Sequence, residues 1–214
     1  MSRYIHDLIK EGEHLRQDFK YEITDSRKIA RTLSAFSNTE GGKLLIGVKD
    51  NGHITGVSSD EEYHMIEAAA QMYCQPVVTF SCKKWNIKGK YILEVDIPCS
   101  DSKPVYAQTH ENQWQSYIRV HDQNILAPSV LLSVWKKQHR NKGIYFRYDP
   151  EKKILLNYLE QHRCISLSQY CRIGKLTRRK AVDILSDLVI LNVIRIEYTE
   201  KGSVYCFVDI SEEA

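Results

Sequence analysis

The sequence predicts an α+β protein of two domains, one over residues 1–140 and a smaller one over residues 150–212. The first shows the order β-α-β-β-α-β-β-β, which is typical of an α+β domain with a mixed sheet. In the second, three helices precede two strands, which is the layout of a winged helix-turn-helix. The polar, basic segment 136–148 predicts a linker between the two domains.

In the first domain, the spacing of apolar residues predicts each element in turn. Apolar side chains at helical spacing predict a helix over residues 1–12, and a short strand follows over residues 15–21. Asp25 or Ser26 caps the next helix, which Gly41 ends because glycine accepts the left-handed conformation. The remaining elements expected are, in order, a buried strand at 43–48, a hairpin turn at 50–52, a strand at 53–57, a helix at 59–74, strands at 77–85, 90–97 and 115–120, and a helix at 128–139.

The second domain follows a different pattern. A first helix surrounds residues 154–159, and Ser166 or Ser168 caps a short second one. Thr177 caps a third helix, whose apolar residues recur at helical spacing. Two strands, at 193–198 and 204–210, complete the domain.

The composition excludes several classes of protein. The chain has 214 residues, 27% of them charged, and a net charge of +3. No apolar run approaches the roughly 18 residues that a membrane-spanning helix needs. The charged start of the sequence lacks the apolar stretch of a signal peptide. We therefore expect a cytoplasmic protein without a membrane partner. The six cysteines form no Cys-x-x-Cys pair and are expected to be reduced and structural.

Three stretches carry a family resemblance. They read GEHLRQDFKYE, AFSNTEGGKLLIGVKDNGHITGV and SYIRVHDQNILAPS. Together they make residues 8–135 resemble the Schlafen-type AlbA-like domain, which in bacteria is described as DNA-binding or as a transcriptional regulator. The middle stretch is the most specific of the three. The resemblance implies the mixed α+β fold and a nucleic-acid partner.

The same resemblance implies an acidic site. In the nuclease members of the family, three acids lie at positions that match Glu13, Asp18 and Asp50 here. Carboxylates of this kind hold Mg²⁺ or Mn²⁺ and activate water for phosphodiester cleavage. Asp18 departs from the family glutamate and is one methylene shorter. Glu13 and Asp18 are five residues apart, so they meet only if the chain turns between them. The alternative is that all three are ordinary surface charges.

Basic residues mark a second candidate site. Thr177, Arg178, Arg179 and Lys180 open the third helix of the second domain, and Lys175 precedes them. In a helix-turn-helix, these positions face base edges in the major groove or phosphate oxygens. The alternative is a purely architectural winged helix. By the family resemblance, Lys20 and Arg119 are further candidates for contact with phosphate or with the acidic site.

Three functions follow as hypotheses. The preferred one is a bacterial transcriptional regulator that binds duplex DNA as a homodimer. The alternative is a metal-dependent endoribonuclease that acts on structured RNA with Glu13, Asp18 and Asp50. The third is an adaptor in which both domains bind only proteins.

Overall fold

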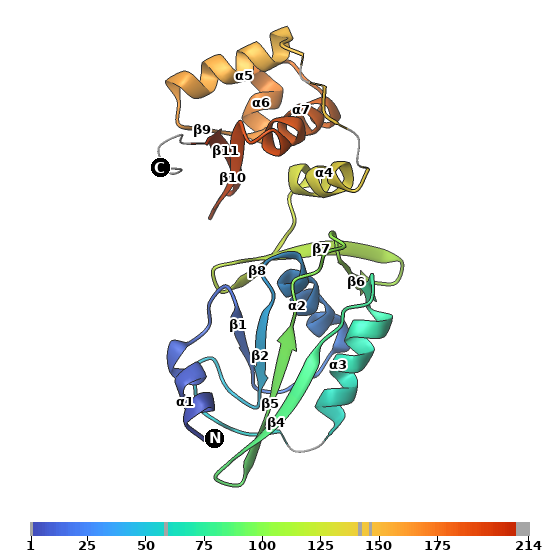
Figure 1. Ribbon diagram of the computed structural model, residues 1–214, viewed down its shortest axis with the longest axis vertical. Coiled ribbons are helices and arrows are strands. Elements are labelled where there is room, and N and C mark those ends of the chain that lie inside the picture. Colours follow the sequence, from blue (N-terminus) through green and yellow to red (C-terminus); the bar gives the residue numbers. More distant parts are fainter. Residues whose placement is uncertain (1, 58–59, 141–142, 146, 209–214) are drawn as a thin grey trace. The chain divides into compact units, whose positions relative to one another are not determined.

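The computed structural model describes residues 2–57, 60–140, 143–145 and 147–208. The chain divides into two compact units, Met1–Ala127 and Pro128–Ala214 (Figure 1). The helix at the end of the expected first domain packs instead with the second unit, so the domain boundary lies at residue 127 rather than 140.

In its described residues, the first unit contains two sheets and three helices, which confirms the α+β class with a mixed sheet. Strands of the first sheet lie in the order β1-β2-β5-β4, with β1 parallel to β2 and the other pairs antiparallel. The second sheet, β3-β6-β7-β8, is entirely antiparallel. The elements are α1 (Ser2–Glu11), β1 (Gln17–Lys20), α2 (Ser26–Asn38), β2 (Gly42–Ile46), α3 (Glu61–Met72), β3 (Cys74–Gln75), β4 (Ser81–Ile87), β5 (Lys90–Ile97), β6 (Tyr106–His110), β7 (Gln113–Val120) and β8 (Gln123–Leu126).

The first sheet is covered on both faces. Alternate residues of β2 point to opposite faces: Leu44 packs in the cluster that contains α2 and α3, whereas Leu45 packs in the cluster with α1. The entry into β2 requires glycine, because a Cβ on Gly42 would collide with the ring of Phe36 and the carbonyl of Arg16. These contacts fix β1 against β2 and therefore fix the acidic stretch that β1 carries.

Asn38, in the AFSNT stretch, joins α2 to the second sheet. Its side chain is buried, accepts a hydrogen bond from the backbone N–H of Val105 (2.7 Å) and donates one to the carbonyl of Tyr117 (2.8 Å). An amide can serve both roles at once, whereas a carboxylate could only accept. This side chain therefore holds β7, and the arginine that β7 carries, against α2.

The second unit is a helical layer against a small sheet. Its elements are α4 (Ser129–Gln138), α5 (Pro150–Gln161), β9 (Cys164–Ser166), α6 (Leu167–Ile173), α7 (Arg178–Ile190), β10 (Ile194–Thr199) and β11 (Gly202–Phe207). The strands form an antiparallel sheet in the order β10-β11-β9. The expected caps form: the Ser166 hydroxyl accepts from the N–H of Gln169, and the Thr177 hydroxyl accepts from the N–H of Lys180.

Several element predictions were wrong. The expected strand at 53–57 makes only isolated bridges, such as that between Val48 and Ile54. The strand expected from residue 77 begins at Ser81. Strands β3, β6, β8 and β9 were not predicted. Residue 59 of the expected helix and residues 209 and 210 of the expected last strand lie outside the described residues. In the part of the chain that the structure describes, no helix is long and apolar enough to cross a bilayer.

Candidate functional site

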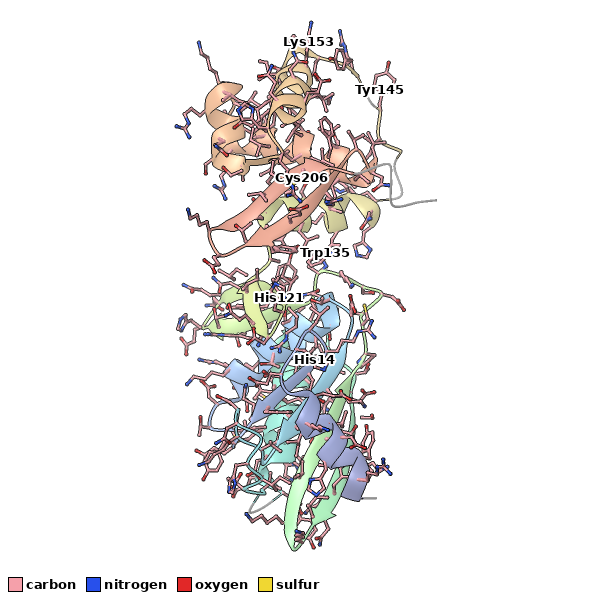
Figure 2. The ribbon with its side chains drawn as sticks, turned by 90° about the vertical axis from the view of Figure 1, so that its left-hand side faces the viewer. His14, His121, Trp135, Tyr145, Lys153 and Cys206 are labelled. Carbon is pink, nitrogen blue, oxygen red and sulfur yellow. A yellow bond between two sulfur atoms is a disulfide. The ribbon has the colours of Figure 1, made fainter. Side chains whose placement is uncertain are left out.

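A tight turn brings the first two predicted acids together. The N–H of His14 donates to the carbonyl of Gln17 (3.0 Å), and the N–H of Gln17 donates to the carbonyl of His14 (3.1 Å). The chain thus reverses between them (His14 is labelled in Figure 2), which places Glu13 opposite Asp18. The Glu13 carboxylate accepts a hydrogen bond from the N–H of Phe19 at 2.9 Å. The structure therefore meets the condition that the five-residue spacing imposed.

The carboxyl group of Glu13 lies in an environment that disfavours its charged form. Burial raises the pKa of Glu13 above its ordinary range, the N–H of Phe19 opposes the rise, and the carboxyl of Asp18 adds to it. Asp18 is itself buried, at 3% exposure. An acid with a raised pKa beside a second acid is a common feature of functional sites. Glu13 is consequently a member of the predicted acidic site whose pKa is raised by its surroundings.

Two cations neutralise Asp18. The Lys20 ammonium lies 2.8 Å from Asp18 Oδ2, and the Arg119 guanidinium lies 3.4 Å from Asp18 Oδ1. Oδ2 is nevertheless buried without a hydrogen bond of good geometry. Lys20 also donates to the carbonyl of Phe19 at 2.7 Å. The charge of Asp18 is compensated by the protein itself.

Arg119 is a buried anchor rather than a surface cation. Its side chain is 1% exposed, and its guanidinium donates to the carbonyls of His14 (3.0 Å) and Gln17 (3.1 Å). It also donates to Asn124 Oδ1 (3.0 Å) and lies over the ring of Phe36. Of the two roles expected for Arg119, support of the acidic site is the one that this position allows. Direct contact with a phosphate would require the side chain to leave the core.

Asp50 does not join the pair. It is exposed in the turn that follows β2, where the N–H of Gly52 donates to the carbonyl of Lys49. Among the described residues, a single group of three His, Cys, Asp or Glu side chains has its ligand atoms within 4.8 Å of one another, and it contains none of the three acids. The ligand atoms of Glu13, Asp18 and Asp50 therefore do not all lie within 4.8 Å of one another as they are placed, and the three-carboxylate site for Mg²⁺ or Mn²⁺ stays a prediction.

The second predicted site, the first turn of α7, is open to solvent. Arg178, Arg179 and Lys180 are all exposed, as are Lys175 and Thr177 before them. Lys180 is paired with Glu151. The first turn of α7 lines an open groove of about 770 Å³, to which Ser133 of α4 also contributes. Exposed cations at a helix N-terminus, where backbone N–H groups are unpaired, form a ready site for phosphate groups.

The outer face of α7 is covered beyond that turn. A helix turns once in 3.6 residues, so Ala181, Ile184, Leu185 and Leu188 share the face that is buried in the core. The opposite face carries Asp183, Ser186 and Asp187, and α4 packs there. Ser133 and Ser186 are joined by a hydrogen bond of 3.0 Å, and the Lys137 ammonium lies 2.6 Å from Asp183 and 2.7 Å from Asp187.

This packing limits how α7 can meet DNA. A reader helix enters the major groove by the face that points away from its own core. In α7, that face is free at Arg179 but occupied by α4 from Asp183 onward, whereas Arg178 lies on the side of Ala181 and Leu185 and is exposed in the first turn. The arginines are exposed as predicted, but the helix cannot lie along base edges while α4 is in place. Residue spacing does not predict this contact, because α4 and α7 are far apart in the sequence.

One cysteine expectation was wrong. Cys164 and Cys206 form a disulfide, whereas Cys74, Cys82, Cys99 and Cys171 are free. Cys164 lies on β9 and Cys206 directly opposite on β11. Cys-x-x-Cys spacing could not reveal the pair, because the sequence separation is 42 residues.

Comparisons with known proteins give one family and weaker likenesses. A family model described as Schlafen, AlbA_2 matches residues 13–128, which is more than half of the chain. The Poxin-Schlafen protein of monkeypox virus is 39% identical over 66 residues, which are 29% of this chain and 13% of the viral protein. The DIP2311 protein of Corynebacterium diphtheriae matches with a TM-score of 0.46 at 16% identity, over 66% of this chain and 33% of that one. The N-terminal domain of a RecG-related protein from Nitrosomonas europaea matches with a TM-score of 0.41 at 19% identity, over 68% of this chain and 97% of that domain.

Proposed function

Because the chain belongs to the Schlafen, AlbA_2 family and its second unit exposes a cationic helix start, we propose that it binds nucleic acid through phosphate contacts at the first turn of α7. The observation that carries the proposal is the exposure of Arg178 and Arg179 on the groove at the start of a 13-residue helix. Among the described residues, neither arginine forms an ion pair, unlike their neighbour Lys180.

The layout of the second unit supports this role. Its order after α4 is helix, strand, helix, helix, strand, strand, with the three strands in one sheet. We interpret it as a winged helix-turn-helix module, in which α6 and α7 are the paired helices. The turn between them contains Lys175 at a positive φ of 50°. This turn adds an exposed cation two residues before Thr177, the cap of α7.

The covered face of α7 favours backbone contact over base reading. Arginine and lysine bind phosphate oxygens without reading sequence, and such contacts position a protein on the duplex. We therefore propose that duplex DNA is held largely independently of its sequence when α4 is packed on α7. A sequence-specific regulator would require α4 to move away. Homodimerisation stays a prediction.

The experiment that tests the proposal is duplex binding as a function of salt. Fluorescence anisotropy with a labelled DNA duplex is compared for the wild type and the Arg178→Ala/Arg179→Ala variant. Each phosphate contact contributes about 0.9 to the slope of log K against log salt, so the variant should flatten the slope by about 1.8. A matched control, Lys153→Ala/Arg163→Ala, removes two exposed cations from elsewhere in the same unit.

The outcomes separate the three hypotheses. Loss of affinity in the α7 variant but not in the control supports the proposal. An equal loss of affinity in the α7 variant and the control would mean that only the net charge matters, which would contradict the proposal. No binding by the wild type at low salt favours the adaptor hypothesis. A structured RNA probe in the same assay establishes which nucleic acid is preferred.

The endoribonuclease hypothesis is tested separately. The protein is incubated with Mn²⁺ and transfer RNA beside the Asp50→Ala and Glu13→Gln variants. Since Asp50 lies outside the Glu13–Asp18 pair, we expect no cleavage that depends on all three acids. Cleavage that both variants abolish would show that the Asp50 turn closes on the pair and would restore the nuclease hypothesis.

A further inference from the structure

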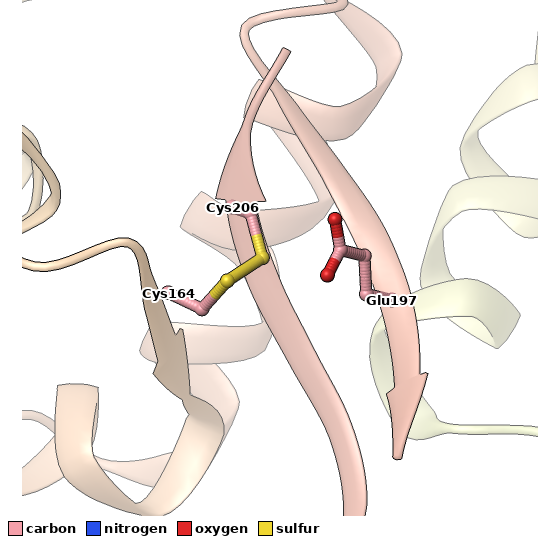
Figure 3. A group of neighbouring side chains, drawn as sticks. All are labelled: Cys164, Glu197 and Cys206. Carbon is pink, nitrogen blue, oxygen red and sulfur yellow. A yellow bond between two sulfur atoms is a disulfide. The ribbon is translucent and has the colours of Figure 1, made fainter. Parts of the chain in front are cut away.

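The disulfide of the second unit has an acidic neighbour. Figure 3 shows Cys164, Cys206 and Glu197 with their side chains directed toward one another. Each residue comes from a different strand of the sheet: β9, β11 and β10. Their sulfur and carboxylate atoms all lie within 4.8 Å of one another. In the part of the chain that the structure describes, no other group of three such residues meets this distance.

Sheet register places the three side chains on one face. Cys164 pairs directly with Cys206, with their Cα atoms 4.4 Å apart. Glu197 pairs with Val204, which lies two residues before Cys206 and thus shares its face. Tyr205, between Val204 and Cys206, points to the opposite face and packs in the core of the unit. Three hydrogen-bonded strands therefore hold the three groups rigidly in place.

We propose that, once the disulfide is reduced, Cys164, Cys206 and Glu197 form a binding site for a zinc-type divalent metal ion. Reduction breaks the S–S bond with two electrons and two protons from a thiol reductant, which itself becomes a disulfide. The metal ion then displaces a proton from each thiol and binds both thiolates and one carboxylate oxygen. Reoxidation by a disulfide oxidant restores the S–S bond and expels the ion, so the two states exclude each other.

The donor set fits this class of ion. Two thiolates and a carboxylate suit zinc, which takes four ligands and accepts water as the fourth. Their summed charge of minus three is moderated by Arg195, whose Nε lies 2.9 Å from Glu197 Oε1. This contact leaves the second carboxylate oxygen of Glu197 for the metal. It also orients the carboxylate, as outer partners of metal ligands commonly do.

Exposure provides a route for the ion. Cys206 is buried, at 2% exposure, whereas Cys164 and Glu197 are partly exposed. An ion can therefore arrive from the side of Cys164 and Glu197, and a water can complete its coordination there. Hard ions such as Mg²⁺ would bind weakly at this site, because they prefer oxygen ligands to sulfur.

The test uses the full chain in both redox states. The protein is reduced with a phosphine under anaerobic conditions, thiols are counted, and Co²⁺ is titrated in as an optical substitute for zinc. We expect thiolate-to-cobalt charge-transfer absorption that saturates at one ion per chain and disappears when Zn²⁺ displaces Co²⁺. Oxidised protein should show no such absorption.

Variants assign the ligands. Cys206→Ser should abolish the charge-transfer absorption, whereas Cys99→Ser, which removes an exposed thiol outside the site, should leave it unchanged. Glu197→Gln keeps both thiols and the size of the side chain, and should weaken Co²⁺ binding by about tenfold or more. Circular dichroism of each reduced variant confirms that it is folded.

Three results would overturn the proposal. One is reduced, folded protein that binds no Co²⁺ through sulfur. Another is unchanged affinity in Glu197→Gln, which would remove the carboxylate from the site. The third is a thiol count showing that the Cys164–Cys206 bond resists the phosphine while the protein stays folded, which would make the disulfide purely structural.

Discussion

Replacing Arg119 by Met should destabilise the first unit strongly. The guanidinium is buried between β7 and the hairpin that carries Glu13 and Asp18, and it is 1% exposed. Met is similar in length and apolar, so the substitution removes the charge and the donors while largely filling the space. The acceptors left behind are Asp18, the side-chain oxygen of Asn124 and the carbonyls of His14 and Gln17.

The expected decrease in the free energy of unfolding follows from the partners that Arg119 loses. Breaking a buried ion pair by removing one member costs about 3–5 kcal/mol, because the remaining charge is left uncompensated. Lys20 still lies 2.8 Å from Asp18, so part of the charge stays paired and the lower end of that range is expected. Arg119→Lys retains the charge but cannot reach all the acceptors at once, and should cost about 1–3 kcal/mol.

Urea denaturation measures both variants. Trp85 and Trp114 lie in the first unit and report its unfolding by fluorescence. Arg16→Met is the matched control, since Arg16 lies in the same hairpin but its ion pair with Glu40 is exposed, at 64% and 45%. A surface pair of this kind contributes under about 1 kcal/mol. If Arg119→Met costs no more than Arg16→Met, the anchoring role assigned to Arg119 is wrong.

Two further predictions concern buried carboxylates and pH. Burial and Asp18 raise the pKa of Glu13 in the folded state, so its ionisation destabilises the fold as pH rises through that pKa. Glu13→Gln keeps the acceptor for the backbone and should not lower stability at pH 7 in urea denaturation; a loss above about 1 kcal/mol would contradict this. For Glu94, burial alone would raise the pKa, but hydrogen bonds from Tyr4, Lys43 and Trp85 outweigh it and the pKa is lowered. Its contribution is therefore present at neutral pH and lost as pH falls through the folded-state pKa, and Glu94→Gln should flatten this acid loss of stability. An unchanged acid profile in that variant would contradict the assignment.

Local patterns were sufficient to predict most helices. Caps at Asp25, Ser166 and Thr177 form as the side-chain types indicate, because capping depends on residues only a few positions apart. The short strands β3 and β9 were missed because two or three residues contain no periodicity. Their pairing is decided by partners far along the chain. Residues 53–57 resemble a strand locally but find no continuous partner.

The candidate sites show the same difference between local features, which the sequence predicts, and long-range contacts, which it does not. Positions Glu13 and Asp18 come from a short motif, and the turn between them is local, so their approach was foreseeable. The burial of Arg119 depends on β7 returning to β1 across about a hundred residues of sequence, with separations of 102 and 105 to its two carbonyl partners. Contact between α4 and α7 spans 53 residues at Ser133 and Ser186. Spacing along the chain contains no information on such pairs.

Duplex affinity with α4 locked onto α7 tests the central claim most directly. The Ser133→Cys/Ser186→Cys variant replaces the 3.0 Å hydrogen bond between these side chains by an engineered disulfide. Affinity is compared in the same protein before and after selective reduction of that disulfide. If phosphates bind at Arg178 and Arg179 while α4 stays in place, the locked and unlocked forms should bind a DNA duplex equally. A large fall in affinity on locking would show that α4 must move away from α7 before DNA can bind. That result would contradict phosphate binding with α4 in place.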